Sequence, residues 1–284
     1  MLSDFTNKLE QLNTDYLGYS DVLNSGFPQS SPKTRIFTPV KNNYSINSVI
    51  QYPKGYTKEY LEHKLQRRHL NMYFQKLSNT SDKVIDAVGE FINNYSNKQT
   101  LYQIPCDVVV CSKTSATTNN ISLIHLHYPN EWSATDAIGK PFNYFHKDLI
   151  RQDGRSIVPD HYKLIDNFIH SGKFYERVGA FSIRKQPQLD LHPNIITKNG
   201  WKKGEKLKDV FLRFERQVVA GLPIIDSFIF LIHTYFVSAS SKPKLLKNAI
   251  VNRDKYCYPR KVIDSLEKEL IECCDTHINN QSSF

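Results

Sequence analysis

A chain of 284 residues with 40% hydrophobic and 12% aromatic residues is long enough and apolar enough for one large or two small domains with a substantial core. Its net charge of +9 suits an anionic cofactor or an acidic protein partner, but Lys and Arg are locally dense only at 64–68 and 202–208, which argues against nucleic-acid binding. The five cysteines lack any metal or ferredoxin spacing and no signal peptide opens the chain, so we expect a reducing, cytoplasmic setting.

The first part of the chain is irregular. Residues 1–57 are rich in Ser, Asn, Pro and Tyr, which predicts an N-terminal arm, and residues 58–284 are expected to form a single domain. The run from Lys58 to Leu77 has apolar residues with basic ones between them, and it predicts a helix. A second helix is expected from Asp82, because the residues that follow place an apolar stripe on one side: Val84, Ile85, Val88, Phe91, Ile92 and Tyr95.

Two strands are predicted between Cys106 and Tyr128, and the turn-prone segment at 112–120 makes them a hairpin with a long loop. His125 and His127 stand two residues apart and should share one face of the second strand. Such a pair could bind a metal, but no carboxylate or third ligand is evident nearby. Hydrogen-bonded histidines of a pocket or core are therefore the favoured interpretation.

The elements after this hairpin are shorter. Ser133 or Thr135 can cap a short helix that Gly139 and Pro141 close, and the next segment carries His146. Periodicity then predicts a helix at 160–171, a strand at 177–184, a polar loop at 185–208, and helices near 243–252 and 259–274. Helices, a mainly antiparallel sheet and helices again make an α+β fold.

The stretch from 210 to 237 combines two apolar segments with a charge cluster. Apolar and charged residues alternate from Val210 to Gln217, and a turn at Gly221–Pro223 separates this strand from an apolar run at 224–237. The run is too short for a membrane span and is interrupted by Asp226 and His233, so no membrane association is expected. We predict two antiparallel strands buried in one sheet.

Three charged residues of the first of these strands are candidates for a site. Alternation places Arg213 and Arg216 on opposite faces, with Glu215 on the face of Arg213. A solvated strand face with ordinary ion pairs is the alternative, and spacing alone leaves both interpretations open.

Three segments carry a family resemblance. YPNEW at 128–132 resembles a Phe-Pro-Ser-x-Trp motif, and Gly139–Pro141 with Phe145–His146 resembles a Gly-Arg-Pro element followed at the same spacing by Ile-His. LRFERQ at 212–217, LP at 222–223 and FLIHTY at 230–235 resemble a Leu-Arg-x-Glu-Arg-Gln, Leu-Pro and Phe-x-Ile-Arg-Thr-Tyr run. Over about residues 100–240, the chain thus resembles the heme-dependent oxidative N-demethylase family, whose heme subunit has a PAS-like fold.

The sequence departs from the family's motifs at four places. Lys147–Leu149 stands where the family has Pro-Val-Pro, Ala180–Phe181 where it has Asn-Trp, and His233 where it has Arg. Of the family's Gln-Glu-Asp ahead of the first strand, only Asp107 remains. We therefore expect a substrate other than a simple methylamine.

The resemblance implies a PAS-like antiparallel sheet with flanking helices that binds heme b. His146 aligns with the family's histidine and is the expected iron ligand. Of Arg213 and Arg216, one is expected to pair with a heme propionate. Trp132 and Tyr235 are core aromatics or line the pocket.

The implied chemistry is oxidation of an amine, or of another nitrogen-containing small molecule, by O2 at the heme. His233 could donate a hydrogen bond to bound oxygen or contact a propionate. A base that keeps the amine neutral could be Glu215, Asp107, or one of His125, His127 and His233. No nucleotide-binding glycine motif or iron–sulfur cysteine set is present, so a separate reductase is expected to supply electrons.

Two other functions are compatible with the sequence. One is a heme-PAS sensor or binding module without turnover, although no signalling helix or output domain is evident. The other is a basic structural or nucleic-acid-binding protein that has kept the fold and lost the heme.

Overall fold

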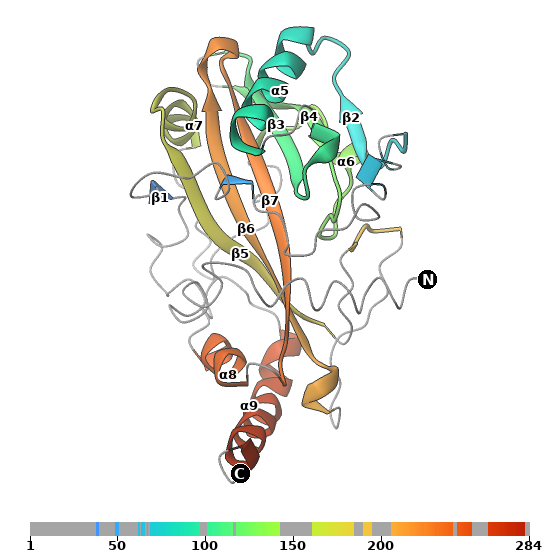
Figure 1. Ribbon diagram of the computed structural model, residues 1–284, viewed down its shortest axis with the longest axis vertical. Coiled ribbons are helices and arrows are strands. Elements are labelled where there is room, and N and C mark those ends of the chain that lie inside the picture. Colours follow the sequence, from blue (N-terminus) through green and yellow to red (C-terminus); the bar gives the residue numbers. More distant parts are fainter. Residues whose placement is uncertain are drawn as a thin grey trace.

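The protein is built on one antiparallel sheet, with strand order β1-β5-β6-β7-β3-β4-β2 in the computed structural model (Figure 1). The structure describes residues 38–39, 49–50, 62, 64–65, 67, 69–96, 101–115, 118–142, 161–184, 190–194, 206–240, 243–251 and 261–281. The strands are β1 (Thr38–Pro39), β2 (Phe74–Lys76), β3 (Asp107–Lys113), β4 (Asn119–His125), β5 (Phe174–Arg184), β6 (Phe211–Leu222) and β7 (Ser227–Ser238). The predicted α+β class and antiparallel sheet are confirmed.

The β6–β7 hairpin forms the middle of this sheet. Its two strands pair over their full length, from Phe211 opposite Ser238 to Leu222 opposite Ser227. A short 3₁₀ turn, η5 (Pro223–Ile225), joins them, and Asp226 after it adopts a left-handed backbone with φ of 48°. The turn therefore starts slightly later than expected, because β6 continues through Gly221.

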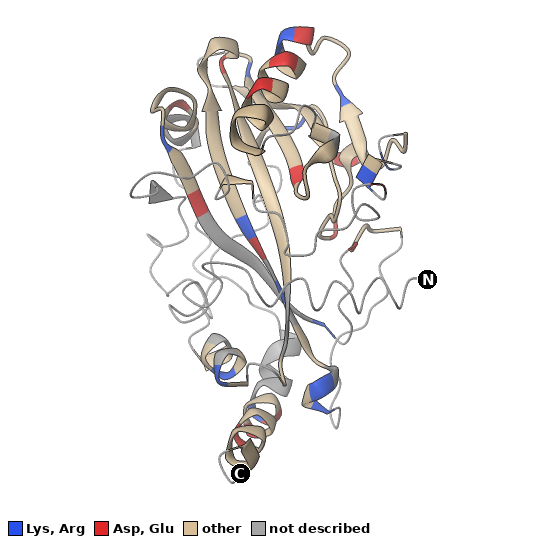
Figure 2. Ribbon diagram, in the orientation of Figure 1, with Lys and Arg blue, Asp and Glu red and all other residues tan. Residues whose placement is uncertain are grey.

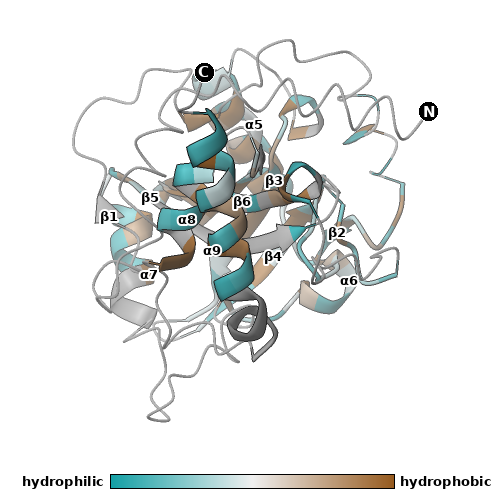
Figure 3. Ribbon diagram, turned by 90° about the horizontal axis from the view of Figure 1, so that it is seen from below, coloured by the Kyte–Doolittle hydropathy of each residue, from teal (hydrophilic) through white to brown (hydrophobic). Residues whose placement is uncertain are grey.

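The helices lie mostly where periodicity placed them. They are α5 (Asp82–Ser96), α6 (Ala134–Ala137), α7 (His161–His170), α8 (Pro243–Val251) and α9 (Lys261–Gln281), with short 3₁₀ turns η2 (Leu101–Gln103) and η4 (Leu207–Asp209). Ser133 caps α6, since its hydroxyl accepts the Asp136 N–H at 3.2 Å. Figure 1 places α8 and α9 at the end of the long hairpin opposite η5, and Figure 3 views them from that end.

The helix predicted from Lys58 to Leu77 is wrong in its C-terminal part. Lys64 and Arg67 are helical, but the chain then turns, and Phe74–Lys76 forms β2 against β4. The backbone N–H groups of Tyr73 and Phe74 bond to Leu70 O at the turn. Without β2, β4 would present an unpaired edge, so pairing within the sheet outweighs the local helical pattern.

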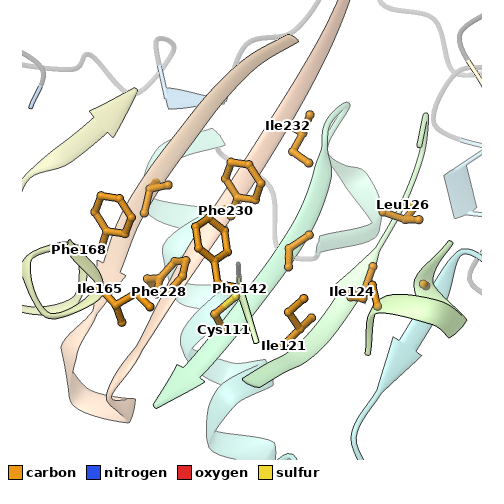
Figure 4. Close-up of a cluster of buried hydrophobic side chains, with 14 of the residues drawn as sticks. Cys111, Ile121, Ile124, Leu126, Phe142, Ile165, Phe168, Phe228, Phe230 and Ile232 are labelled. Atoms are coloured by element: carbon orange, nitrogen blue, oxygen red, sulfur yellow. The ribbon is translucent and has the colours of Figure 1, made fainter. Parts of the chain in front are cut away.

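Two layers of side chains cover the sheet. On the side that we call the α5 face, α5 residues Val84, Val88, Phe91 and Ile92 pack with alternate strand residues, among them Val108, Val110, Val218 and Leu231. The opposite side, which we call the α7 face, holds α6, Phe142 and α7 against Val109, Cys111, Val219, Phe228, Phe230 and Ile232 (Figure 4). Within the predicted arm, the structure describes residues 38–39 and 49–50. Val49 and Ile50 are buried on the α5 face, and Thr38–Pro39 pairs with β5.

Helix α7 approaches the sheet closely at its C-terminal end. A Cβ added at Gly221 would collide with the backbone carbonyl oxygens of Phe168 and Ile169. Glycine is therefore required at this point of β6 for α7 to dock. Within the described ranges, no helix is both long and apolar enough to cross a membrane.

Candidate functional site

The charged residues of β6 lie on both faces of the sheet, as alternation predicted. Arg213, Glu215 and Gln217 belong to the α7 face, whereas Arg216 lies on the α5 face opposite His233 of β7. Figure 2 shows charged bands within β3, β5 and β6. Arg213 is 0% exposed and Glu215 is 4% exposed, so the alternative of a solvated strand face is wrong.

Arg213 is the centre of a buried polar group on the α7 face. Its Nη1 lies 2.8 Å from Glu215 Oε1, and its Nη2 donates to Tyr128 O at 3.1 Å and to Thr234 Oγ1 at 3.2 Å. Gln217 Nε2 donates to Glu215 Oε2 at 2.9 Å. Both oxygens of Glu215 therefore accept hydrogen bonds from neighbouring side chains, which stabilises its charge inside the protein.

Asp107 stands on the same face at the start of β3, where it pairs with Ile232. Its Oδ1 accepts the backbone N–H groups of both His127 and Tyr128, the second at 2.8 Å. Burial raises the pKa of Asp107 to about 6, and nearby Glu215 adds to the rise, while the two N–H groups and Lys64 oppose it. Asp107 consequently exchanges a proton close to neutral pH.

Arg67 holds the other side of the His127–Tyr128 dipeptide. It donates to His127 O through Nη1, and its Nη2 lies 2.6 Å from Asp190 Oδ2. Its guanidinium carbon is 4.5 Å from the centre of the Tyr73 ring and 5.7 Å from that of Tyr128.

Charged side chains therefore hold all four backbone polar groups of this dipeptide. Asp107 accepts both N–H groups, Arg67 donates to the first carbonyl, and Arg213 donates to the second. The His127 and Tyr128 rings are stacked, with centroids 3.8 Å apart and an interplanar angle of 17°. These bonds hold the backbone of His127 and Tyr128 in one conformation, and binding sites require such fixed positions.

Lys64 is a further buried charge near this group, and no pattern in the sequence predicted its burial. Its Nζ donates to Ile104 O at 3.0 Å and to Cys106 O. Burial lowers the pKa of Lys64 to about 8, although Cys106 and Asp107 partly offset this.

The α5 face carries a different set of polar residues. Arg216 pairs with Glu176 at 2.9 Å, and Tyr235 is buried on the same side as His233. Burial lowers the pKa of His233, with Arg216 adding to the effect, so the imidazole is neutral.

His125 and His127 do not form a strand pair. Strand β4 ends at His125, so strand alternation does not extend to His127. Burial also lowers the pKa of His125, with Lys64 adding to the effect. Among the described residues, no group of three or more His, Cys, Asp and Glu side chains could hold a metal ion.

The structure thus divides the candidate residues between two faces. Arg213, Glu215 and Asp107 meet on the α7 face, and Trp132 packs against the hydrophobic cluster there. Arg216, His233 and Tyr235 lie across the sheet. One small ligand cannot contact both sets, because the backbone of the sheet separates them.

His146 lies outside the described residues, and Phe142 and α7 come before and after that gap in the chain. Phe142 packs on the α7 face, with its ring centroid 5.1 Å from that of Phe228 and 5.5 Å from that of Phe230. On the far side of the segment, α7 packs on the same face through Ile165 and Phe168. Because Arg213, Glu215 and Asp107 are also buried on the α7 face, this face is the candidate site.

A comparison with protein families covers this region. The family described as "Haem-dependent oxidative N-demethylase, alpha subunit-like" matches residues 47–250. The chain belongs to this family. The match confirms the resemblance found in the sequence. It includes Arg213, Glu215 and Asp107, whereas α9 lies beyond the matched residues. No protein with a curated description matches the chain.

The N-demethylase family name implies heme, and the donors of the α7 face suit such a cofactor. Arg213 Nε is buried and has no hydrogen-bond partner in the parts of the chain that the structure describes. A buried guanidinium N–H that lacks an acceptor fits a carboxylate, and heme carries propionate carboxylates. The residues present are therefore compatible with the cofactor that the family name implies.

Proposed function

We propose that this protein is a heme-dependent oxidoreductase that uses O2 to oxidise an N-methylated amine or a related nitrogen-containing small molecule, as in oxidative N-demethylation. The observation that carries the proposal is the buried group of Arg213, Glu215 and Asp107 on the α7 face, inside the region that matches the family. Under this proposal, residues 58–284 form a PAS-like domain that binds heme b.

The proposal assigns separate binding tasks to His146 and to residues of the α7 face. His146 is the proposed iron ligand, because it belongs to the motif that resembles the family's Gly-Arg-Pro and Ile-His element. Arg213 pairs with a propionate, and Trp132 contributes to the apolar wall. When bound, the heme supplies oxygen activation, and the protein supplies position, polarity and exclusion of water.

Asp107 is the proposed base for the amine. Glu215 is less suitable, because both of its oxygens already accept bonds from Arg213 and Gln217. Asp107 accepts both backbone N–H groups through Oδ1, and no described residue donates to its Oδ2. With a pKa of about 6, its carboxylate is largely ionised at neutral pH and can take a proton from a substrate ammonium at Oδ2.

In this proposal, the polar residues of the α5 face contribute to stability and not to binding. Arg216, His233 and Tyr235 contact neither heme nor substrate, since the sheet lies between them and the site. His233 differs from the arginine of the family motif, but here it would act on the stability of the hairpin.

The electrons come from a separate reductase under this proposal. The family description contains the words "alpha subunit-like", which supports a multi-subunit enzyme, and the net charge of +9 favours an acidic partner.

A visible spectrum of the purified protein supplied with heme tests the proposal. We expect a Soret band that changes in His146→Ala and is unaffected in His277→Ala, a control on α9 outside the family match. Oxygen consumption and formaldehyde release are then measured with a panel of N-methylated amines. No Soret band in the wild type would contradict the proposal, and heme binding without amine-dependent oxygen uptake would favour a sensor.

A further inference from the structure

His192 is a buried histidine that the proposed reaction does not yet use. It lies in the short described segment 190–194 and is 2% exposed. Its backbone N–H donates to Asp190 Oδ1 at 2.9 Å, and its ring Nδ1 accepts the Asn194 N–H at 3.2 Å. The bond at Nδ1 fixes the orientation of the imidazole, and the bond to Asp190 holds its backbone.

The ring carries its proton on Nε2, for which no described residue is a hydrogen-bond partner. Burial lowers the pKa of His192, and Arg67 adds to this while Asp190 and Asp136 oppose it, so the ring is neutral. Because Nδ1 accepts a hydrogen bond, the proton resides on Nε2. Nε2 is buried, and no described residue accepts a hydrogen bond from it. Buried donors are rarely left without an acceptor, since the loss of water is then uncompensated.

His192 belongs to the network of the candidate site. Its ring lies 5.2 Å from that of Tyr73, a member of the α7-face cluster, and the Tyr73 hydroxyl donates to Asp190 at 2.8 Å. Asp190 also binds Arg67, which holds the His127 carbonyl. The segment is anchored to the YPNEW motif as well, because Leu191 exchanges backbone hydrogen bonds with residues 129 and 131.

The network therefore contains two buried polar atoms of the same kind. Both Arg213 Nε and His192 Nε2 are N–H donors without an acceptor among the described residues. A ligand that satisfies both must present acceptor oxygens. Ionised carboxylates make the strongest hydrogen bonds with such donors.

We propose that His192 is a ligand-contacting residue whose Nε2–H donates to a carboxylate of the molecule bound on the α7 face. The inference rests on the proposed function and extends it to a residue absent from the family-like motifs. The carboxylate belongs either to a heme propionate or to an amino-acid-type amine substrate. Arg67, Asp190 and Tyr73 act as positioning residues that hold the imidazole in place.

Two substitutions of His192 distinguish the effect of its N–H donor from the effect of its aromatic ring. His192→Phe keeps an aromatic ring against Tyr73 but removes the N–H, and His192→Gln restores a donor close to the position of Nε2. His277→Phe on α9 is the matched control. Circular dichroism and thermal unfolding of each variant establish that the fold is retained.

Titration of the apoprotein identifies the source of the carboxylate. If it is a propionate, His192→Phe should weaken hemin binding about tenfold, His192→Gln should recover most of the loss, and hemin dimethyl ester should bind both variants alike. If it belongs to the substrate, hemin binding stays unchanged. KM for N-methylglycine then rises about tenfold in His192→Phe, and KM for dimethylamine does not.

Equal hemin affinities together with equal KM values in wild type and His192→Phe would overturn the inference. A failure of the proposed function looks different, because the wild type would then bind no heme at all. In that case, the Nε2–H resonance of ¹⁵N-histidine-labelled protein is followed during addition of N-methylglycine, with His192→Phe providing its assignment. A shift of this resonance supports the carboxylate contact, and no shift overturns it.

Discussion

The two faces of the β6–β7 hairpin are chemically unlike, although they are built from the same strands. The α7 face encloses the carboxylates Asp107 and Glu215, and Arg213 is completely buried beside them. On the α5 face, Arg216 and the neutral His233 are buried, and the carboxylate partner of Arg216, Glu176, keeps 35% of its side chain exposed. The proposed function assigns the amine's proton to Asp107, the α7-face carboxyl group whose pKa is raised to about 6.

The largest expected effect is on turnover. Asp107→Asn retains an oxygen that can accept the N–H groups of His127 and Tyr128, but it cannot take a proton. We expect heme binding to survive and kcat/KM for amine oxidation to fall roughly 10²–10⁴-fold. Stopped-flow or oxygen-electrode assays measure this. Glu176→Gln on the α5 face is the control, and an equal loss in both variants would remove the distinction between the faces.

Stability should also differ between the faces. Arg213→Met leaves the Glu215 carboxylate buried without its cation, which should lower the free energy of unfolding by about 3–5 kcal/mol. Arg216→Met should cost only about 1 kcal/mol, because Glu176 can turn to water. Urea denaturation of both variants provides the comparison. Similar losses of unfolding free energy in both variants would show that the buried Arg213–Glu215 pair contributes no more than the Arg216–Glu176 pair.

Asp107 should make stability and activity depend on pH in opposite directions. Its pKa is about 6 in the fold against 3.8 ordinarily, so the folded protein holds this proton more tightly than the unfolded chain. The resulting stabilisation is complete below about pH 4 and is lost as the pH rises through about 6, and it amounts to about 3 kcal/mol. Turnover should instead increase over the same rise, because the ionised form is the base.

The free energy of unfolding between pH 4 and pH 8 tests this dependence. The difference between wild type and Asp107→Asn isolates the contribution of this one carboxyl group. Parallel curves for the two proteins would contradict a raised pKa.

A smaller loss of stability is expected when the close contact between α7 and Gly221 of β6 is disturbed. Gly221→Ala should destabilise the protein by about 1–3 kcal/mol, because the new methyl group collides with backbone carbonyls of Phe168 and Ile169. Gly172→Ala is the control, since nothing lies within 4 Å of its added Cβ and only its φ of 62° opposes the change, at a cost of about 1 kcal/mol. If the first variant loses no more stability than the second, α7 can move away from β6.

Features encoded within one element could be predicted from the sequence. The stripe of α5, the Ser133 cap and the alternation of Arg213 and Arg216 each depend on neighbours a few residues away. Family motifs added the α7-face residues Asp107 and Glu215 as candidates, but they did not indicate that His233 lies on the other side.

The contacts that assemble the site were beyond such reasoning. Lys64 reaches Cys106 across 42 residues, Arg67 reaches His127 across 60, and Tyr73 reaches Asp190 across 117. Nothing in the local pattern around these residues indicates their partners. The same holds for β2, whose strand conformation depends on the edge of β4.

The full-length pairing of β6 and β7 also limits how this protein can change. Strand β7 is hydrogen-bonded to β6 on one side and to β3 on the other, so it cannot slide without breaking two ladders. Removing or adding one residue of β6 between Arg216 and the η5 turn would exchange the sides of Arg213 and Arg216, whereas a change of two would preserve them. Length variation in this hairpin is therefore expected in pairs, or in the η5 turn, and a designer who wishes to alter the site should replace side chains and keep the strand length.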